Sequence, residues 1–142
     1  MNIPWLSRWW KKPASLGARG EAAAARYLKR KGYKIVARGQ RDRLGEIDLI
    51  AVDPAPARRG VVFVEVKTRT SDQAGRPDEA VDVRKQRQLT RVCLTYLKRH
   101  DLLECRARFD IVAVTWPAGA REPKIEHFES AFDSVGEGQF FS

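Results

Sequence analysis

The chain has 142 residues and a formal net charge of +9, and 43% of its residues are hydrophobic. This size and composition are typical of a single soluble domain with its own core. No apolar run approaches the ~20 residues of a membrane helix, and the amino terminus lacks a signal-peptide core, so we expect a cytoplasmic protein with no membrane partner. The two cysteines, Cys93 and Cys105, lack metal-motif spacing, and their small number argues against a disulfide framework.

The positive charge is concentrated in the first third of the chain. Residues 1–44 carry twelve Lys or Arg and two acidic residues, whereas residues 45–142 carry fifteen and sixteen. A basic region joined to an acid-containing one indicates an anionic polymer such as nucleic acid as partner. A basic surface that only maintains solubility is the alternative.

Residues 1–14 form a basic, tryptophan-rich tail ahead of a domain over residues 15–133, and residues 134–142 form a second tail. Aromatic and basic side chains together can stack on nucleobases or lie at a membrane interface. We favour a tail whose tryptophans pack on the domain. The residues concerned are Trp5, Trp9 and Trp10 with Arg8, Lys11 and Lys12.

The domain is expected to begin with a helix over residues 16–31, capped by Ser15 and ended by Gly32. Glu21 lies near the start of this helix, where the helix dipole favours an acid. A short strand over residues 33–37 then leads toward a basic connection.

Three arginines, Arg38, Arg41 and Arg43, lie in that connection. The planar guanidinium group donates paired hydrogen bonds that match a phosphate. An exposed basic turn is the simpler interpretation, and the two are compatible because phosphate contacts are usually exposed.

Two apolar segments that flank a loop with two prolines and a glycine predict an antiparallel hairpin. They are residues 45–52 and 61–69. If the loop is symmetric, facing residues have numbers that sum to 113, so Asp48 faces Glu65 with Cβ atoms about 4.5–5.5 Å apart. Two carboxylates this close repel unless one is protonated or a cation lies between them. Such hard oxygen ligands suit Mg²⁺ or Mn²⁺.

An ordinary ion ladder is the alternative for this hairpin. Glu46 would then pair with Lys67, and Asp48 would be solvated at a sheet edge. What favours the metal interpretation is that Glu65 and Lys67 form a Glu-x-Lys run beside an acid on the neighbouring strand.

A polar segment over residues 70–77 is expected to form a flap beside the hairpin, followed by a helix from Pro77-Asp78 to about His100. The apolar stripe of this helix includes Cys93, which we interpret as a packing residue. The stripe turns polar at Lys85 and Gln86. A solvated face or a grip on a nucleic-acid backbone would consist of Arg84, Arg87 and Arg91.

The last part of the domain predicts two more strands. One covers residues 108–116 and carries Asp110, which we interpret as half of a structural pair. The other is an edge strand over residues 124–128, in which we expect His127 to be exposed.

The hairpin residues carry a family resemblance. Asp48, followed after sixteen residues by Glu65-Val66-Lys67, resembles the catalytic core of the PD-(D/E)xK nucleases, although Ile47 stands where the name expects proline. With Gly20-Glu21, these segments resemble the YraN-type family of predicted endonucleases over about residues 15–133. That family is in turn similar to archaeal Holliday-junction resolvases. The resemblance implies a restriction-endonuclease-like α/β fold, a mixed sheet of four or five strands flanked by helices.

The resemblance also implies a site. Its catalytic residues would be Asp48, Glu65, Lys67 and Glu21, of which the three acids would hold Mg²⁺ or Mn²⁺. Nucleic acid would be bound by Arg38, Arg41, Arg43, Arg69, Lys85 and Arg87, with Glu46 and Gln86 in support. The expected function is metal-dependent hydrolysis of phosphodiester bonds in branched or structured DNA, by a possible homodimer because two strands must be cut. A non-catalytic nucleic-acid-binding module of this fold, or a nuclease that acts on RNA, remains an alternative.

Overall fold

A computed structural model describes residues 15–71 and 81–133 of the chain. The tryptophan-rich tail, most of the expected flap and the carboxyl-terminal tail therefore lie outside the described residues. The elements in chain order are α1 (Leu16–Arg30), β1 (Lys34–Asp42), β2 (Gly45–Val52), a 3₁₀ turn η2 (Pro56–Arg58), β3 (Val61–Arg69), α2 (Val83–Arg99), β4 (Ala107–Thr115) and β5 (Lys124–Phe132).

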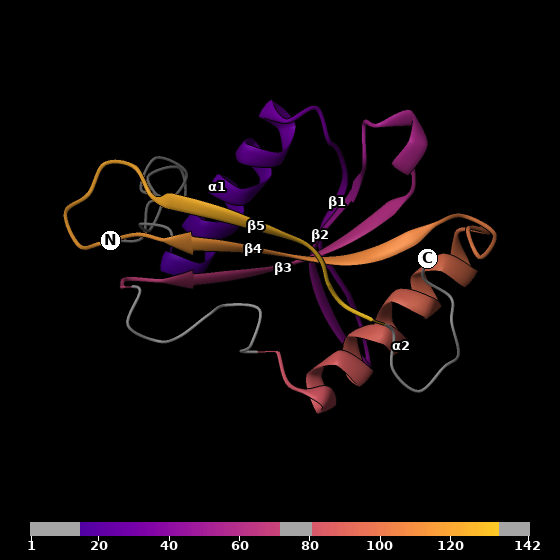
Figure 1. Ribbon diagram of the computed structural model, residues 1–142. Coiled ribbons are helices and arrows are strands. Elements are labelled where there is room, and N and C mark those ends of the chain that lie inside the picture. The colour runs from indigo at the N-terminus through magenta and orange to yellow at the C-terminus, as the bar shows by residue number, and fades with distance from the viewer. Residues whose placement is uncertain (1–14, 72–80, 134–142) are drawn as a thin grey trace, which may run out of the picture.

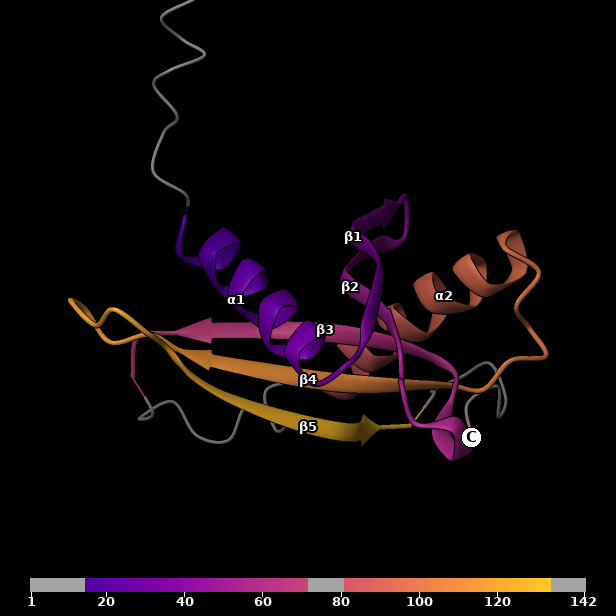
Figure 2. The same cartoon turned by 90° about the horizontal axis from the view of Figure 1, so that it is seen from above.

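The five strands form one mixed sheet in the order β1-β2-β3-β4-β5 (Figure 1). β3 and β4 are parallel, as the helical connection between them requires, and the other neighbours are antiparallel. β1 and β2 turn away from the plane of the other three strands (Figure 2). The expected mixed α/β sheet flanked by helices is confirmed.

Each helix covers one face of the sheet, and the alternation of side chains along β3 decides which residues meet which helix. Val62 and Val64 pack in the cluster that contains Leu28 of α1. Phe63 points the other way and packs with Leu89 and Cys93 of α2. The packing role expected for Cys93 is thereby confirmed. No helix among the described residues has the length and apolar character needed to cross a membrane.

The limits of α1 follow local signals. Ser15 caps the helix, since its Oγ accepts a hydrogen bond from the Ala18 N–H at 3.1 Å. Gly32 has a φ of +93°, a conformation in which a glycine ends helices readily, and it lies two residues beyond the last helical residue. The helix expected over residues 16–31 is therefore found almost unchanged.

Other boundaries differ from the sequence prediction. The described helix α2 begins at Val83, where Asp82 accepts a hydrogen bond from the Lys85 N–H at 2.8 Å, and not at Pro77-Asp78. β1 is longer than residues 33–37 because a register shift between Ile35 and Ala37 lets it continue along β2. β5 likewise continues four residues past 128, to Phe132.

A buried ionic network joins the residue that follows β2 to the start of β4 and to β5. The Arg108 guanidinium donates to Asp53 at 2.6 Å and to Asp110 at 2.9 Å, and His127 lies 2.7 Å from the other oxygen of Asp110. The interpretation of Asp110 as half of a structural pair is confirmed. The expectation for His127 was wrong, because only 2% of its side chain is exposed.

Candidate active site

The candidate active site lies where the β2–β3 hairpin separates. The expected register is confirmed over four pairs, from Val52 opposite Val61 to Leu49 opposite Val64, and the ladder ends there. Asp48 and Glu65 are the next residue on each strand. Figure 2 shows β2 leaving the plane of β3 beyond this hairpin pairing, so the two acids stand at a fork in the sheet.

Asp48 takes over a hydrogen bond at the fork. Its Oδ2 accepts from the Val66 N–H at 2.8 Å, so the carboxylate occupies the place that a strand partner would otherwise fill. Its side chain also hydrogen-bonds with Glu65. Burial raises the pKa of Asp48, and the nearby charge of Glu46 adds to this, against the lowering effect of the Val66 hydrogen bond and of Lys85.

Glu65 is the most enclosed acid of the fork, with 9% of its surface exposed. Burial, and after it the neighbouring charge of Asp48, raises the pKa of Glu65 to about 7. Two ammonium groups lie near its Oε1, Lys67 at 3.7 Å and Lys85 at 3.8 Å. Both distances exceed those of a good charged hydrogen bond, so the lysines reduce the rise in pKa without cancelling it.

Glu21 reaches the fork from α1. Its side chain hydrogen-bonds with Asp48, and burial, followed by the charges of Asp48 and Glu46, raises its pKa. Asp48 therefore interacts with two other acids, Glu21 from α1 and Glu65 from β3.

The contact that brings α1 this close involves a residue that the sequence analysis gave no structural role. A Cβ atom built on Gly20 would lie 1.9 Å from Oγ1 of Thr68 on β3. Only a glycine lets the helix backbone approach the strand here, and the next residue is Glu21. The adjacent Gly20-Glu21 pair was a sequence signal, but the partner Thr68 is far away in the chain.

Among the other residues predicted for the site, Lys85 and Glu46 interact with the acids of the fork. Glu46 is close enough to raise the pKa of Asp48, while its carboxylate accepts from Arg41 at 2.7 Å. Gln86 instead donates to the carbonyl oxygen of Val81 at 2.8 Å. The remaining predicted residues are exposed, apart from a half-buried Arg69 at the end of β3: Arg38, Arg43 and Arg87.

Hard carboxylate oxygens are the donors that Mg²⁺ and Mn²⁺ prefer. Asp48 and Glu65 are in contact, both have raised pKa values, and both would become better ligands once a cation favoured their ionised forms. Within residues 15–71 and 81–133, no group of three or more His, Cys, Asp or Glu is arranged as a metal cage. Mg²⁺ is usually held by one or two carboxylates and keeps several waters, so this donor set fits it.

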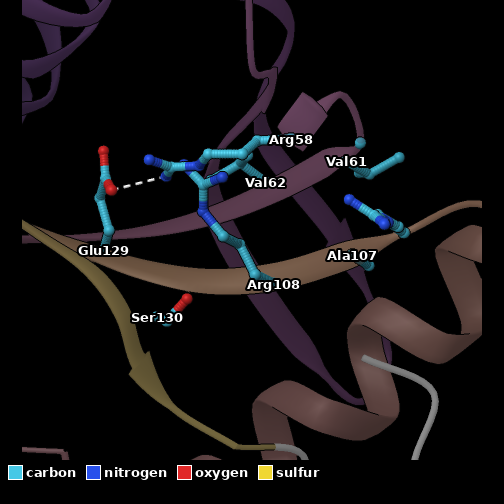
Figure 3. A pocket seen from close by; sticks show the side chains of 9 residues that line it. Arg58, Val61, Val62, Ala107, Arg108, Glu129 and Ser130 are labelled. Atoms are coloured by element: carbon cyan, nitrogen blue, oxygen red, sulfur yellow. Dashed lines mark hydrogen bonds and ion pairs between the residues drawn. The ribbon is translucent and has the colours of Figure 1, made fainter. Parts of the chain in front are cut away.

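Another pocket lies away from the fork. It has a volume of about 320 Å³ and lies at the start of β3 and β4, beside the buried ionic network. Figure 3 shows its arginines, among which Arg58 reaches Glu129. Arg108 is likewise bonded to Asp53 and Asp110. Because these guanidinium groups are already paired, the pocket does not offer the chemistry of the fork.

The fold and the fork together define a small α/β protein with a carboxylate and lysine cluster at the edge of a hairpin. Residues 20–114 match the uncharacterised protein family UPF0102. The chain is 50% identical over 129 residues to the UPF0102 protein RB9115 of Rhodopirellula baltica, covering 90% of this chain and 76% of that protein. It is 45% identical over 119 residues to a UPF0102 protein of Geobacter metallireducens, covering 84% and 93%. The chain belongs to the UPF0102 family, and the YraN-type resemblance is confirmed.

Solved structures offer more distant likenesses. A repair endonuclease from Pyrococcus abyssi matches with a TM-score of 0.41 and 19% identity, over 78% of this chain and 42% of that one. An EndoMS–dsDNA complex matches with a TM-score of 0.41 and 18% identity, over 78% and 41%. This chain spans less than half of those proteins, and likenesses at this level assign no activity to it.

Proposed function

We propose that this protein is a metal-dependent nuclease that hydrolyses phosphodiester bonds in nucleic acid, with branched or otherwise structured DNA as its substrate. The observation that carries the proposal is the contact between Asp48 and the buried Glu65 at the fork, with two lysine ammonium groups within 4.0 Å of Glu65. Two acids that are buried side by side repel each other, so such a pair is costly unless a cation balances its charge. Acids with pKa values perturbed in this way are concentrated at functional sites.

Phosphodiester hydrolysis needs an attacking water, neutralisation of the phosphate and stabilisation of the leaving oxygen. Asp48 and Glu65 would hold the divalent ion, which supplies Lewis-acid activation of water and phosphate when bound. Lys67 places positive charge beside the acids, where it would stabilise the charge that develops on the phosphate. Glu21 would orient water or complete the ligand shell.

Lys85 is the second ammonium group at Glu65, and it comes from the helix α2. With Asp48 and Glu65 occupied by a cation, the lysine would be released to contact the phosphate. Its role differs from that of Gln86, whose side-chain amide donates a hydrogen bond to the Val81 carbonyl oxygen just before the helix.

The test is cleavage by the purified protein. Labelled four-way junctions, flaps, linear duplexes and single-stranded RNA are incubated with Mn²⁺, with Mg²⁺ or with EDTA, and products are resolved on denaturing gels. We expect metal-dependent nicking of the branched DNA. Binding without cleavage under every metal condition would contradict the nuclease and support a binding module, and cleavage of RNA alone would identify the other substrate.

Metal binding has a readout of its own. Mn²⁺ should raise the melting temperature of the wild-type protein, because a ligand that binds only the folded state stabilises it. The double variant D48N/E65Q should lose that shift. An equal shift in both proteins would place the metal elsewhere.

A further inference from the structure

The exposed side of α2 carries a strongly basic groove close to the fork. The groove has a volume of about 310 Å³ and is lined by Leu44, Arg84, Arg87, Gln88 and Arg91. None of these residues is acidic. Figure 1 and Figure 2 both show the turn between β1 and β2 beside α2, which forms the other wall.

The composition of α2 argues against a surface kept only for solubility. The helix holds six Lys or Arg over Val83–Arg99 and no Asp or Glu. Arg84, Arg87 and Arg91 follow one another at helical spacings of three and four, where like charges repel one another and destabilise the helix. A solubilising helix face normally mixes both signs of charge. The repulsion is relieved when an anion binds along the stripe.

The wall of the groove is held in place. The Gln88 amide donates to the carbonyl oxygen of Leu44 at 2.8 Å, which ties the β1–β2 turn to the helix. A Cβ atom on Gly45 would lie 3.0 Å from Nε2 of Gln88, so the turn approaches the helix closely. Arg84 and Arg87, by contrast, are exposed and make no hydrogen bond or ion pair with any described residue.

The dimensions fit a nucleic-acid strand. Arg84 to Arg91 spans about 10 Å along the helix at a rise of about 1.5 Å per residue. One strand of a duplex carries a phosphate about every 3.4 Å of helix axis, so the stripe can reach about three successive phosphates. Lys85 links this surface to the fork, because it lies on the same helical turn as Arg84 and Arg87, with its ammonium group 3.8 Å from Glu65.

We propose that the α2 groove, defined by Arg84, Arg87 and Arg91 with the β1–β2 turn, binds the phosphate backbone of a duplex arm and leads its strand to the acids at the fork. The inference rests on the proposed function for its substrate. Contacts of this kind carry no sequence information, so the groove recognises DNA by backbone charge and shape.

The experiment measures binding in EDTA, where metal-dependent cleavage is absent. Fluorescently labelled duplexes of two unrelated sequences and a four-way junction are titrated with wild-type protein and R84Q/R87Q at several salt concentrations. The matched control is R26Q/R30Q, which removes the same charge from exposed positions on α1. Circular dichroism and melting temperature verify that each variant is folded.

We expect R84Q/R87Q to weaken binding to both duplexes by the same factor, about tenfold or more at physiological salt. The slope of log affinity against log salt should fall by about 2, one for each lost phosphate contact. R26Q/R30Q should change the slope by much less, and R84K/R87K should keep most of it. Equal slopes for wild type and R84Q/R87Q, an equal loss in both variants, or no binding by the wild type would overturn the proposal.

This inference and the nuclease proposal fail in distinguishable ways. Groove-dependent binding by a protein that never cleaves would leave the groove standing and remove the nuclease. If the wild type cleaves DNA but R84Q/R87Q binds DNA as tightly as the wild type does, the nuclease proposal is supported and the groove proposal is wrong.

Discussion

The central strands carry two groups of buried acids, and their charges are balanced in different ways. In the ionic network, Arg108 bonds Asp53 and Asp110 at 2.6 and 2.9 Å. At the fork, the nearest ammonium groups lie 3.7 and 3.8 Å from Glu65. Burial alone would raise the pKa of every one of these carboxyls, and the difference lies in what opposes it.

In the network, hydrogen bonds from His127 and Arg108 overcome burial and hold the pKa of Asp110 below its usual range. At the fork Lys85 and Lys67 offset burial and the charge of Asp48 only in part, and the pKa of Glu65 rises to about 7. The comparison teaches that the network is electrostatically complete within the chain, whereas the fork is short of positive charge. A site of the second kind is suited to a cation from solution.

Among the substitutions that test this comparison, the largest loss of stability is expected in the ionic network. Asp110→Ala removes a fully buried carboxylate and leaves Arg108 without its bidentate partner. Removal of one partner from a buried ion pair costs about 3–5 kcal/mol. Urea denaturation should show this loss of unfolding free energy. A loss below about 1 kcal/mol would mean that the network is not the stabilising element described here.

At the fork, single substitutions should remove activity and spare the fold. We expect D48N, E65Q and K67M each to reduce metal-dependent nicking by about a hundredfold or more, because each removes charge stabilisation of several kcal/mol from the transition state. E65Q should unfold at a urea concentration no lower than the wild type, since it replaces an acid that is destabilised by burial. Wild-type cleavage by any of the three would remove that residue from the site.

The pH dependence of stability should separate the two groups of acids. Because the folded-state pKa of Glu65 is about 7, above its ordinary value of 4.5, the metal-free folded protein holds a proton that the unfolded chain releases. Unfolding free energy should therefore fall as pH rises from about 4.5 to about 7. E65Q should flatten this slope, which urea titrations in EDTA at several pH values would measure.

The network should give the opposite sign. The pKa values of Asp53 and Asp110 lie below their ordinary value of 3.8, so their contribution is present above that pH and is lost as pH falls through the folded-state values. The slope below pH 4 should persist in E65Q. Its disappearance in that variant would show that the two groups are not independent.

A smaller effect should come from the close approach of α1. Gly20→Ala would place a methyl group 1.9 Å from Oγ1 of Thr68, so helix and strand must separate, at a cost of about 1–3 kcal/mol. Glu21 would move with the helix, and we expect about a tenfold loss of cleavage in protein that is still folded. Gly17→Ala is the matched control, because no atom lies within 4 Å of the added methyl. It should gain up to about 1 kcal/mol of stability from helix propensity and keep full activity.

The features that the sequence predicted correctly rest on local signals. The hairpin register follows from a loop of defined length between two apolar segments, and α1 follows from Ser15 and Gly32. The meeting of Asp48 and Glu65 could be predicted because it needs only that register. The reach of Glu21 and Lys85 to the fork was expected from the family resemblance, since neither position in the chain indicates it.

The incorrect predictions concern features that depend on contacts outside the local segment. His127 is buried because Asp110, on a neighbouring strand, supplies a partner that its own segment does not reveal. β1 continues past residue 37 because a bulge realigns it with β2. The start of α2 was set too early because Pro77 is a common first helical residue, whereas Asp82 provides the actual cap.

Because Gly20 has no side chain, the size of the Thr68 side chain sets the distance between α1 and β3 at this contact. Shortening residue 68 would let the helix settle inward, and lengthening it would lift the helix outward, with the first acid of the site carried along. A series of substitutions at this single strand position would thus change the position of Glu21 relative to the fork without altering any of the acids or lysines there.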